Sequence, residues 1–228
     1  MIPLRDSIRP RRRPFVNWLI IGINIYAFIL QLSLSPAELQ QFFQQFGIIP
    51  ARISGFEFSM LFTGTWTPLL PLFTAMFLHG GWWHLLGNML YLWVFGDNIE
   101  DRLGHLGYLI FYLLMGIAAS LTHVWSDPTS TVPMIGASGA VAGVLGAYFI
   151  TFPRARVVAL VPVFFFLTFT EIKAVYFLFF WFLLQALSGL GSIPGAQAVA
   201  WWAHIGGFIA GALVFFLFRP GTRNYIRY

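Results

Sequence analysis

The chain has 228 residues, of which 58% are hydrophobic, 19% aromatic and only 9% charged. Soluble domains carry roughly a quarter charged residues, so this composition excludes an ordinary water-soluble domain and predicts a protein solvated largely by lipid. The net charge of +5 does not favour nucleic-acid binding, because the basic residues lie in short clusters, and the lack of cysteine excludes disulfides, thiolate metal sites and cysteine nucleophiles.

Six apolar runs are candidates for membrane-spanning helices. A span needs about 20 mostly apolar residues, because only a helix satisfies its own backbone polar groups in hydrocarbon. In chain order the runs cover residues 15–32, 84–100, 107–125, 135–152, 174–190 and 199–218. The sequence therefore predicts an all-α polytopic membrane protein with six transmembrane helices.

The basic residues predict the orientation of these helices. Lys and Arg in short loops remain on the cytoplasmic side, and five arginines precede the first run. With that tail in the cytoplasm, six spans place every basic residue except Arg52 on the same side. We expect a basic cytoplasmic tail at residues 1–14, a membrane domain at 15–219 and a cytoplasmic C-terminal tail at 220–228, in a prokaryotic plasma (inner) membrane.

Two other segments are apolar without being predicted spans. Residues 33–75 form a long first loop rich in phenylalanine, for which we expect short helices partly embedded in the outer interface. Residues 157–170 are apolar but few, and Pro162 interrupts them. We expect a re-entrant or interfacial stretch at the cytoplasmic face rather than a seventh span.

Burying a polar side chain inside a membrane span costs free energy. Such residues are therefore found mainly where they pair with another polar group or have a functional role. His84 and Asn88 lie four residues apart, so both point from one face of the second span. Ser138 lies at the start of the fourth span and His204 near the start of the sixth. Since all three spans begin at the outer face, these four side chains share a depth within about 10 Å of the outer interface.

Small residues indicate which of these helices touch. Small residues spaced three or four positions apart form a stripe along one face of a helix, and such stripes let transmembrane backbones approach closely. A close approach of the fourth and sixth spans would bring Ser138 against His204. A serine needs an adjacent base to become a nucleophile, and a neutral imidazole is such a base. His84, Asn88 and the backbone N–H groups around Ser138 would stabilise a developing oxyanion. The stripes are Ser138, Ala142 and Gly146 on the fourth span, and His204, Gly207 and Gly211 on the sixth.

Over residues 70–215 the chain resembles the rhomboid intramembrane serine proteases of the six-span bacterial type. The resemblance rests on four motifs in the family's order. They are HGGWWHLLGN at 79–88, GDNIEDRLG at 96–104, GASG at 136–139 and AHIGG at 203–207 with Gly211. It implies a rhomboid-like six-helix bundle with a long, partly membrane-embedded first loop, and a peptidase active without cofactor or metal.

The resemblance also implies a role for each motif residue. Ser138 would be the nucleophile and His204 the general base, while His84, Asn88 and the Ser138 main-chain N–H would stabilise the oxyanion. Substrates would be single-span transmembrane proteins, cut near the outer interface. The supporting positions would be His79, Gly136, Gly139, Gly207 and Gly211.

The chain departs from the family pattern at two places. It reads Leu70-Pro71 where many relatives have Trp-Arg, and Ala142 where some relatives have an aromatic residue stacked on the base. No acidic residue is placed to complete a triad. His105 and His123 belong to no motif, and we interpret them as loop residues.

Two alternatives remain open at this point: a non-catalytic rhomboid-like binder of membrane proteins, and a small-solute transporter, for which polar residues at one depth could form a site. The presence of both Ser138 and His204 disfavours the first. The second is disfavoured because the polar groups gather near the outer face. The oligomeric state and the natural substrate are not legible in the sequence.

Overall fold

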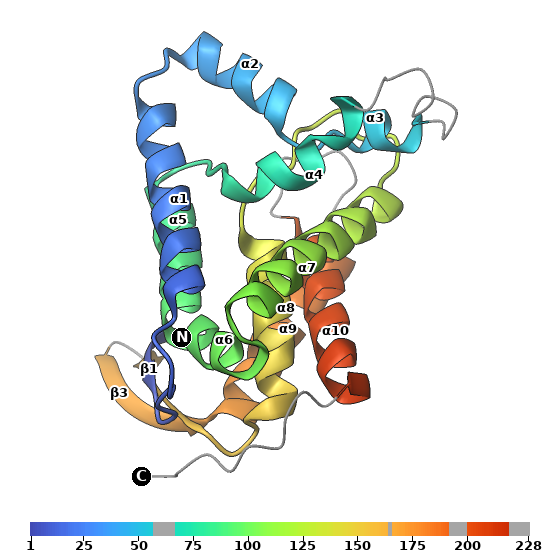
Figure 1. Ribbon diagram of the computed structural model, residues 1–228. Coiled ribbons are helices and arrows are strands. Elements are labelled where there is room, and N and C mark those ends of the chain that lie inside the picture. Colours follow the sequence, from blue (N-terminus) through green and yellow to red (C-terminus); the bar gives the residue numbers. More distant parts are fainter. Residues whose placement is uncertain (57–66, 164–165, 192–199, 219–228) are drawn as a thin grey trace.

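A computed structural model describes residues 1–56, 67–163, 166–191 and 200–218 of the chain (Figure 1). The predicted tail at 220–228 and residue 199, where the sixth predicted span begins, lie outside these residues. The helices that correspond to the predicted spans are α1 (Phe15–Leu32), α5 (Trp82–Tyr91) continued by η4 (Leu92–Gly96) and α6 (Asp97–Leu103), α7 (His105–Ser126), α8 (Ser138–Thr151), α9 (Ala174–Leu190) and α10 (Trp201–Phe218).

Each of the six predicted spans is therefore helical over most of its described residues, although the fourth becomes helical only at Ser138 and not at residue 135. Among the described residues, α1, α7 and α10 are long and apolar enough to cross a membrane by themselves. Helices α8 and α9 are shorter apolar helices of 14 and 17 residues. The chain is an all-α polytopic membrane protein in its main architecture, as the composition predicts.

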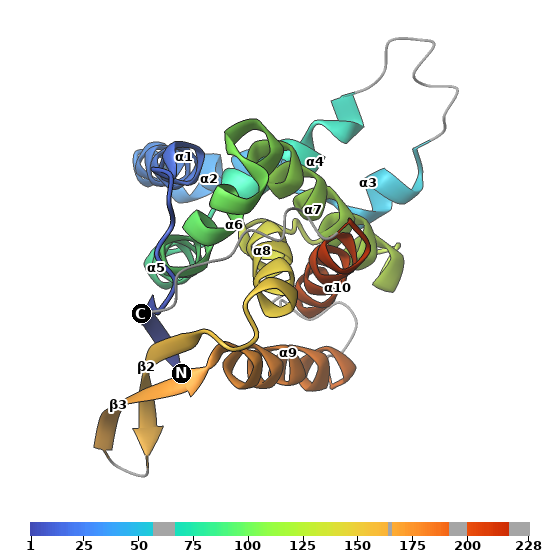
Figure 2. The same ribbon diagram turned by 60° about the horizontal axis from the view of Figure 1, so that its bottom comes forward.

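Helix α8 lies at the centre of the bundle. Figure 2 shows it surrounded by α5, α6, α7, α9 and α10. Its residues 139–148 are all buried, and many are Gly or Ala, so a helix that is apolar on every side is enclosed by its neighbours. A Cβ added to Gly211 of α10 would clash with the carbonyl oxygen of Gly143, so α8 and α10 are in backbone contact.

The second predicted span is interrupted by the π-helical turn η4. Such a turn disturbs the regular i to i−4 hydrogen bonding of an α-helix. The Asn17 side chain of α1 donates to the carbonyl oxygen of Leu92 at 2.9 Å. About two turns further, the buried Glu100 carboxylate accepts hydrogen bonds from the backbone N–H groups of Val16 and Asn17 at 3.0 and 2.7 Å. These bonds fasten the start of α1 to the inner half of the span.

A three-stranded antiparallel sheet lies at the end of the bundle opposite α2 and α3 (Figure 1). The strands are β1 (Ile2–Asp6), β2 (Arg156–Val163) and β3 (Phe166–Lys173), in the order β1-β2-β3. The apolar stretch at 157–170 is thus mostly a β-hairpin and not a span, and the N-terminal tail supplies its third strand. The sequence analysis did not predict this sheet.

The first loop contains short helices, as predicted, in the part that the structure describes. Helix α2 (Pro36–Phe46) begins with a capping box, in which Ser35 and Glu38 bond to each other's backbone N–H groups. The other elements are α3 (Pro50–Ser54), η2 (Thr67–Leu69), α4 (Pro71–Thr74) and η3 (Ala75–Phe77). Residues 57–66 lie outside the described ranges.

Candidate active site

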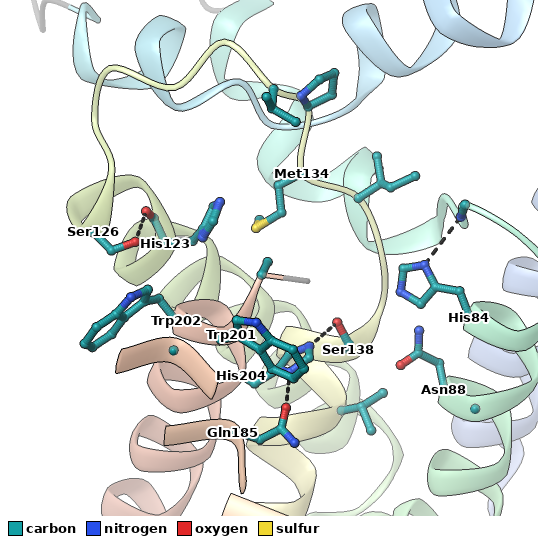
Figure 3. A pocket seen from close by; sticks show the side chains of 18 of the residues that line it. His84, Asn88, His123, Ser126, Met134, Ser138, Gln185, Trp201, Trp202 and His204 are labelled. Carbon is teal, nitrogen blue, oxygen red and sulfur yellow. Dashed lines mark hydrogen bonds between the residues drawn. The ribbon is translucent and has the colours of Figure 1, made fainter. Parts of the chain in front are cut away.

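Ser138 and His204 lie close together where helices α8 and α10 begin. Ser138 is the first residue of α8, and His204 lies one turn into α10. The Oγ of Ser138 lies 2.8 Å from the Nε2 of His204 (Figure 3). His204 is buried, with an exposed fraction of 7%, and Ser138 is half-buried at the wall of a cavity. The structure thus brings together the two side chains that the sequence analysis paired.

Glycines set this distance, because they allow the two helices to meet at their backbones. A Cβ on Gly207 would clash with the carbonyl oxygen of Gly139, in the turn that begins with Ser138. The same holds one turn further for Gly211 against Gly143 and, on α8, for Gly146 against the carbonyl of Phe208. The stripe predicted on the sixth span therefore faces α8. On α8 the closest contacts are at Gly139, Gly143 and Gly146, of which only Gly146 belongs to the predicted stripe.

The second imidazole nitrogen of His204 also has a partner. Its Nδ1 lies 2.7 Å from the Oε1 of Gln185, which comes from α9 (Figure 3). The rings of Trp181 and Trp201 flank the imidazole with centroids 6.0 Å away. Sequence reasoning missed Gln185, although a carboxamide alone in an apolar span is the signal that marks such a residue.

His84 lies across the cavity from Ser138 (Figure 3). Its Nδ1 accepts a long 3.4 Å bond from the Gly80 N–H, which leaves the proton of the neutral ring on Nε2. The position that a Cβ of Gly136 would occupy lies 2.6 Å from this Nε2 and 3.6 Å from Ser138 Oγ. The imidazole and the hydroxyl therefore flank one small space. Gly136 has φ +124°, which side chains rarely adopt, so only glycine fits there.

Asn88 lies one turn below His84 on the same helix, as the spacing predicts, and its Nδ2 lies 3.1 Å from the Nε2 of His79. One amide hydrogen is used in this contact, and the second remains for another acceptor. His79 is buried, and Gln31 of α1 holds its backbone with two hydrogen bonds of 2.6 and 3.0 Å. The structure thus packs His79 against Asn88 and against the ring of His84, 5.1 Å away between centroids, outside the lining of the cavity.

One cavity of about 1050 Å³ is lined by Ser138, His204, Gln185, His84 and Asn88, and its walls come from α5, the end of α7, the loop before α8, and α8, α9 and α10. His123 and Ser126 of α7 belong to its wall. The interpretation of His105 and His123 as loop residues is wrong, because α7 extends from one to beyond the other. His105 bonds to the buried Glu100 at 2.5 Å at the far end of α7.

The arrangement provides a hydroxyl, a base and several donors around one space. The first N–H groups of α8 have no partner inside the helix, so they add to the donors at Ser138. Among the residues that the structure describes, no group of three or more His, Asp or Glu side chains is placed to hold a metal ion. The geometry suits acyl transfer through a covalent serine intermediate.

Comparisons with known proteins agree on one family. The model of the Rhomboid domain matches residues 65–221. The chain is similar to the mitochondrial Rhomboid protein 1 of Saccharomyces cerevisiae, with 35% identity over 99 residues, 42% of this chain and 29% of that protein. It is 34% identical to Rhomboid-like protease 5 of Toxoplasma gondii over 145 residues, 61% of this chain and 15% of that protein.

A third relative is the mitochondrial Presenilin-associated rhomboid-like protein of Mus musculus. The identity is 30% over 144 residues, which are 62% of this chain and 36% of that protein. The chain therefore spans little more than a third, at most, of the length of these relatives.

Proposed function

The chain belongs to the rhomboid family, and we propose that it is an intramembrane serine endopeptidase with a Ser138–His204 dyad. The observation that carries this proposal is the 2.8 Å contact between Ser138 Oγ and His204 Nε2 inside a 1050 Å³ cavity. Each side chain alone has common structural roles. Their contact in a cavity that also holds oxyanion donors is what favours catalysis.

The first half of the reaction forms an acyl-enzyme. Ser138 Oγ attacks the carbonyl carbon of the scissile peptide bond, and His204 Nε2 takes the hydroxyl proton. The negative charge moves to the carbonyl oxygen of the tetrahedral intermediate. When this intermediate collapses, the C–N bond breaks and the imidazolium returns its proton to the leaving amine.

Three donors are available for the oxyanion: His84 Nε2–H, Asn88 Nδ2–H and the backbone N–H of Ser138. They come from two helices that the protein already holds in place, so they need no reorganisation during the reaction. His79 and Gln31 support Asn88 from behind. Gly136 keeps the space between His84 and Ser138 open for the substrate carbonyl.

The second half of the reaction releases the acid product. A water molecule loses a proton to His204 Nε2 and attacks the ester carbonyl, and the second tetrahedral intermediate expels Ser138 Oγ. The imidazolium then reprotonates the serine. Water must therefore reach the cavity, which agrees with the polar groups that His123, Ser126 and Asp127 add to its wall.

We further propose that the substrates are single-span membrane proteins. A helical segment hides its carbonyl groups, so the cleaved stretch must unwind, which favours weak helix formers such as Gly near the cut. We also propose that the cavity lies near the outer interface of a plasma (inner) membrane, with the N-terminal strand in the cytoplasm; the clustering of basic residues on one side of the predicted spans supports this orientation. The family relationship supports membrane residence but not a particular membrane.

The test is cleavage of a single-span substrate by the purified chain in liposomes, with a fluorophosphonate as probe of the serine. We expect cleavage and labelling at Ser138, and loss of both in Ser138→Ala and of cleavage in His204→Ala. Ser120→Ala is the matched control, because the Ser120 hydroxyl is buried and bonds back to its own helix at Gly116. Cleavage that persists in Ser138→Ala would overturn the proposal, and substrate binding without cleavage by the wild type would favour a non-catalytic binder.

A further inference from the structure

Helix α9 carries a single strongly polar side chain, that of Gln185, which lines the active-site cavity. The helix reads AVYFLFFWFLLQALSGL and contains no charged residue and one carboxamide, that of Gln185. Its neighbours Leu184 and Leu187 are each 58% exposed on the lipid-facing side. A carboxamide is costly in such surroundings unless it is hydrogen-bonded. Gln185 meets this condition by bonding to His204 at 2.7 Å.

This bond determines which nitrogen of His204 carries the proton. The Oε1 atom of a carboxamide only accepts hydrogen bonds, so Nδ1 must be the protonated nitrogen of the neutral ring. Nε2 then has its lone pair directed at Ser138 Oγ, 2.8 Å away. In the other tautomer Nε2 would donate to the serine and would be unable to take its proton.

The described surroundings contain no other residue that could set this tautomer. Position 142, one turn after Ser138, is an alanine, so no aromatic ring from α8 lies against the imidazole. Trp181 and Trp201 pack beside it at 6.0 Å between ring centroids, which restrains the ring plane but does not provide an acceptor for Nδ1–H. Gln185 Oε1 is the acceptor that the structure gives to Nδ1.

We propose that Gln185 is the positioning residue of the site, which holds the His204 ring of the Ser138–His204 dyad in its orientation and tautomer. This inference rests on the proposed peptidase function and adds a positioning residue to it. The carboxamide fixes the ring and its tautomer without bringing a charge into a buried site, where an unpaired carboxylate would carry a large desolvation penalty. It lends the imidazolium less stabilisation than a carboxylate would.

The test uses two substitutions at one position. Gln185→Leu keeps the size of the side chain and removes the acceptor, and Gln185→Glu restores an acceptor with a charge. We expect Gln185→Leu to lower kcat about 10- to 100-fold with KM unchanged, as for other misplaced catalytic groups. The rate of fluorophosphonate labelling at Ser138 should fall in parallel.

Gln185→Glu should recover most of the lost kcat, and its pH profile separates positioning from mere packing. The carboxylate would stabilise the imidazolium, so the acidic limb of the kcat profile should move to higher pH. Ser188→Ala, which removes a polar group from the same helix, is the matched control and should match the wild type in kcat and pH profile. Thermal unfolding in detergent checks that all variants fold.

A spectroscopic measurement tests the tautomer without a substrate. ¹⁵N-histidine spectra of the protein, with the His204 signals assigned by comparison with His204→Asn, should show the proton on Nδ1 in the wild type. A wild type with the proton on Nε2, or an unchanged kcat in Gln185→Leu, would overturn the inference. If Ser138→Ala still cleaved the substrate, the proposed function itself would fail, so the two failures are distinguishable.

Discussion

Ile48 and Met134 exchange two backbone hydrogen bonds, from Ile48 N–H to Met134 O at 2.9 Å and from Met134 N–H to Ile48 O at 2.7 Å. The bridge joins the first loop to the segment that leads into Ser138. Two further bonds strengthen this junction, from Ala51 N–H to Ser130 O and from Gly136 N–H to Ala75 O. The first loop thus forms part of the support of the candidate nucleophile.

Ile48→Ala tests this support. The Ile48 side chain is fully buried with Leu72, Ala75 and Val124, so its truncation should lower the free energy of unfolding by about 2–4 kcal/mol. We expect kcat to fall as well, because the segment that leads into Ser138 would be held less firmly. Thermal unfolding in detergent and cleavage rates measure both effects. Leu106→Ala, a similar truncation at a residue 70% exposed, should leave both close to the wild type.

His84→Ala and Asn88→Ala test the oxyanion donors. Removal of one such donor costs about 10²–10³ in kcat in serine peptidases. We expect a loss of this order in each variant with KM nearly unchanged, because the donors act on the transition state. The double variant should lose less than the product of the two losses, since both donors serve one oxygen atom. A change confined to KM would instead assign the two side chains to substrate binding.

Gly136→Ala tests the space between His84 and Ser138. The new Cβ would lie 2.6 Å from His84 Nε2, and the backbone at φ +124° would be strained. Activity should fall by more than tenfold, measured by cleavage and by labelling of Ser138. Gly22→Ala in α1 is the matched control, because nothing lies within 4 Å of its Cβ position. That variant should retain activity and gain about 0.5–1 kcal/mol from better helix propensity.

The N-terminal strand contains a carboxyl group that titrates near neutrality. Burial raises the pKa of Asp6 from 3.8 to about 7, despite a hydrogen bond from Tyr148 that lowers it. Asn98 Nδ2 donates both to Asp6 at 3.0 Å and to Asp97 at 2.8 Å, so a second carboxyl group faces Asp6. Between pH 4 and 7 the folded protein holds a proton here that the unfolded chain has lost.

The contribution of Asp6 to the free energy of unfolding should therefore decrease as pH rises from about 4 to about 7. Above pH 7 this contribution should change little. Asp6→Asn should flatten the dependence, because a carboxamide stays neutral. The measurement is the thermal unfolding midpoint in one detergent at pH 5 and pH 8. Glu171→Gln on the exposed strand β3 should keep the wild-type slope, and an equal slope in Asp6→Asn would contradict the assignment.

The helices of the bundle could be predicted because a chain in lipid must satisfy its backbone hydrogen bonds internally, which restricts the structures that it can adopt. The bounds predicted for the first and fifth spans coincide with α1 and α9, since an apolar run of span length has no other way to satisfy its backbone. The contact of Ser138 with His204 followed from a shared depth and small-residue faces, both local properties of the sequence. The catalytic roles of these residues stay predictions.

The features that sequence reasoning missed depend on partners far away in the chain. Strand β1 pairs with residues more than 150 positions later, and nothing in a basic tail indicates such a partner. Gln185 acquires its importance only from the rotation of α9 that turns it toward His204. His123 was misplaced although it lies inside the apolar run predicted at 107–125, because α7 continues through it to Ser126.

The pairing of β1 with β2 has a consequence for biosynthesis. Ile2 pairs with Leu160, so strand β1 waits for a partner that is made in the first half of the fourth loop, after α8. At about 5–20 residues per second this interval is roughly 8–30 s. During that time Ile2–Asp6 has no β2 partner, and the sheet closes only after four of the six helical segments have been synthesised.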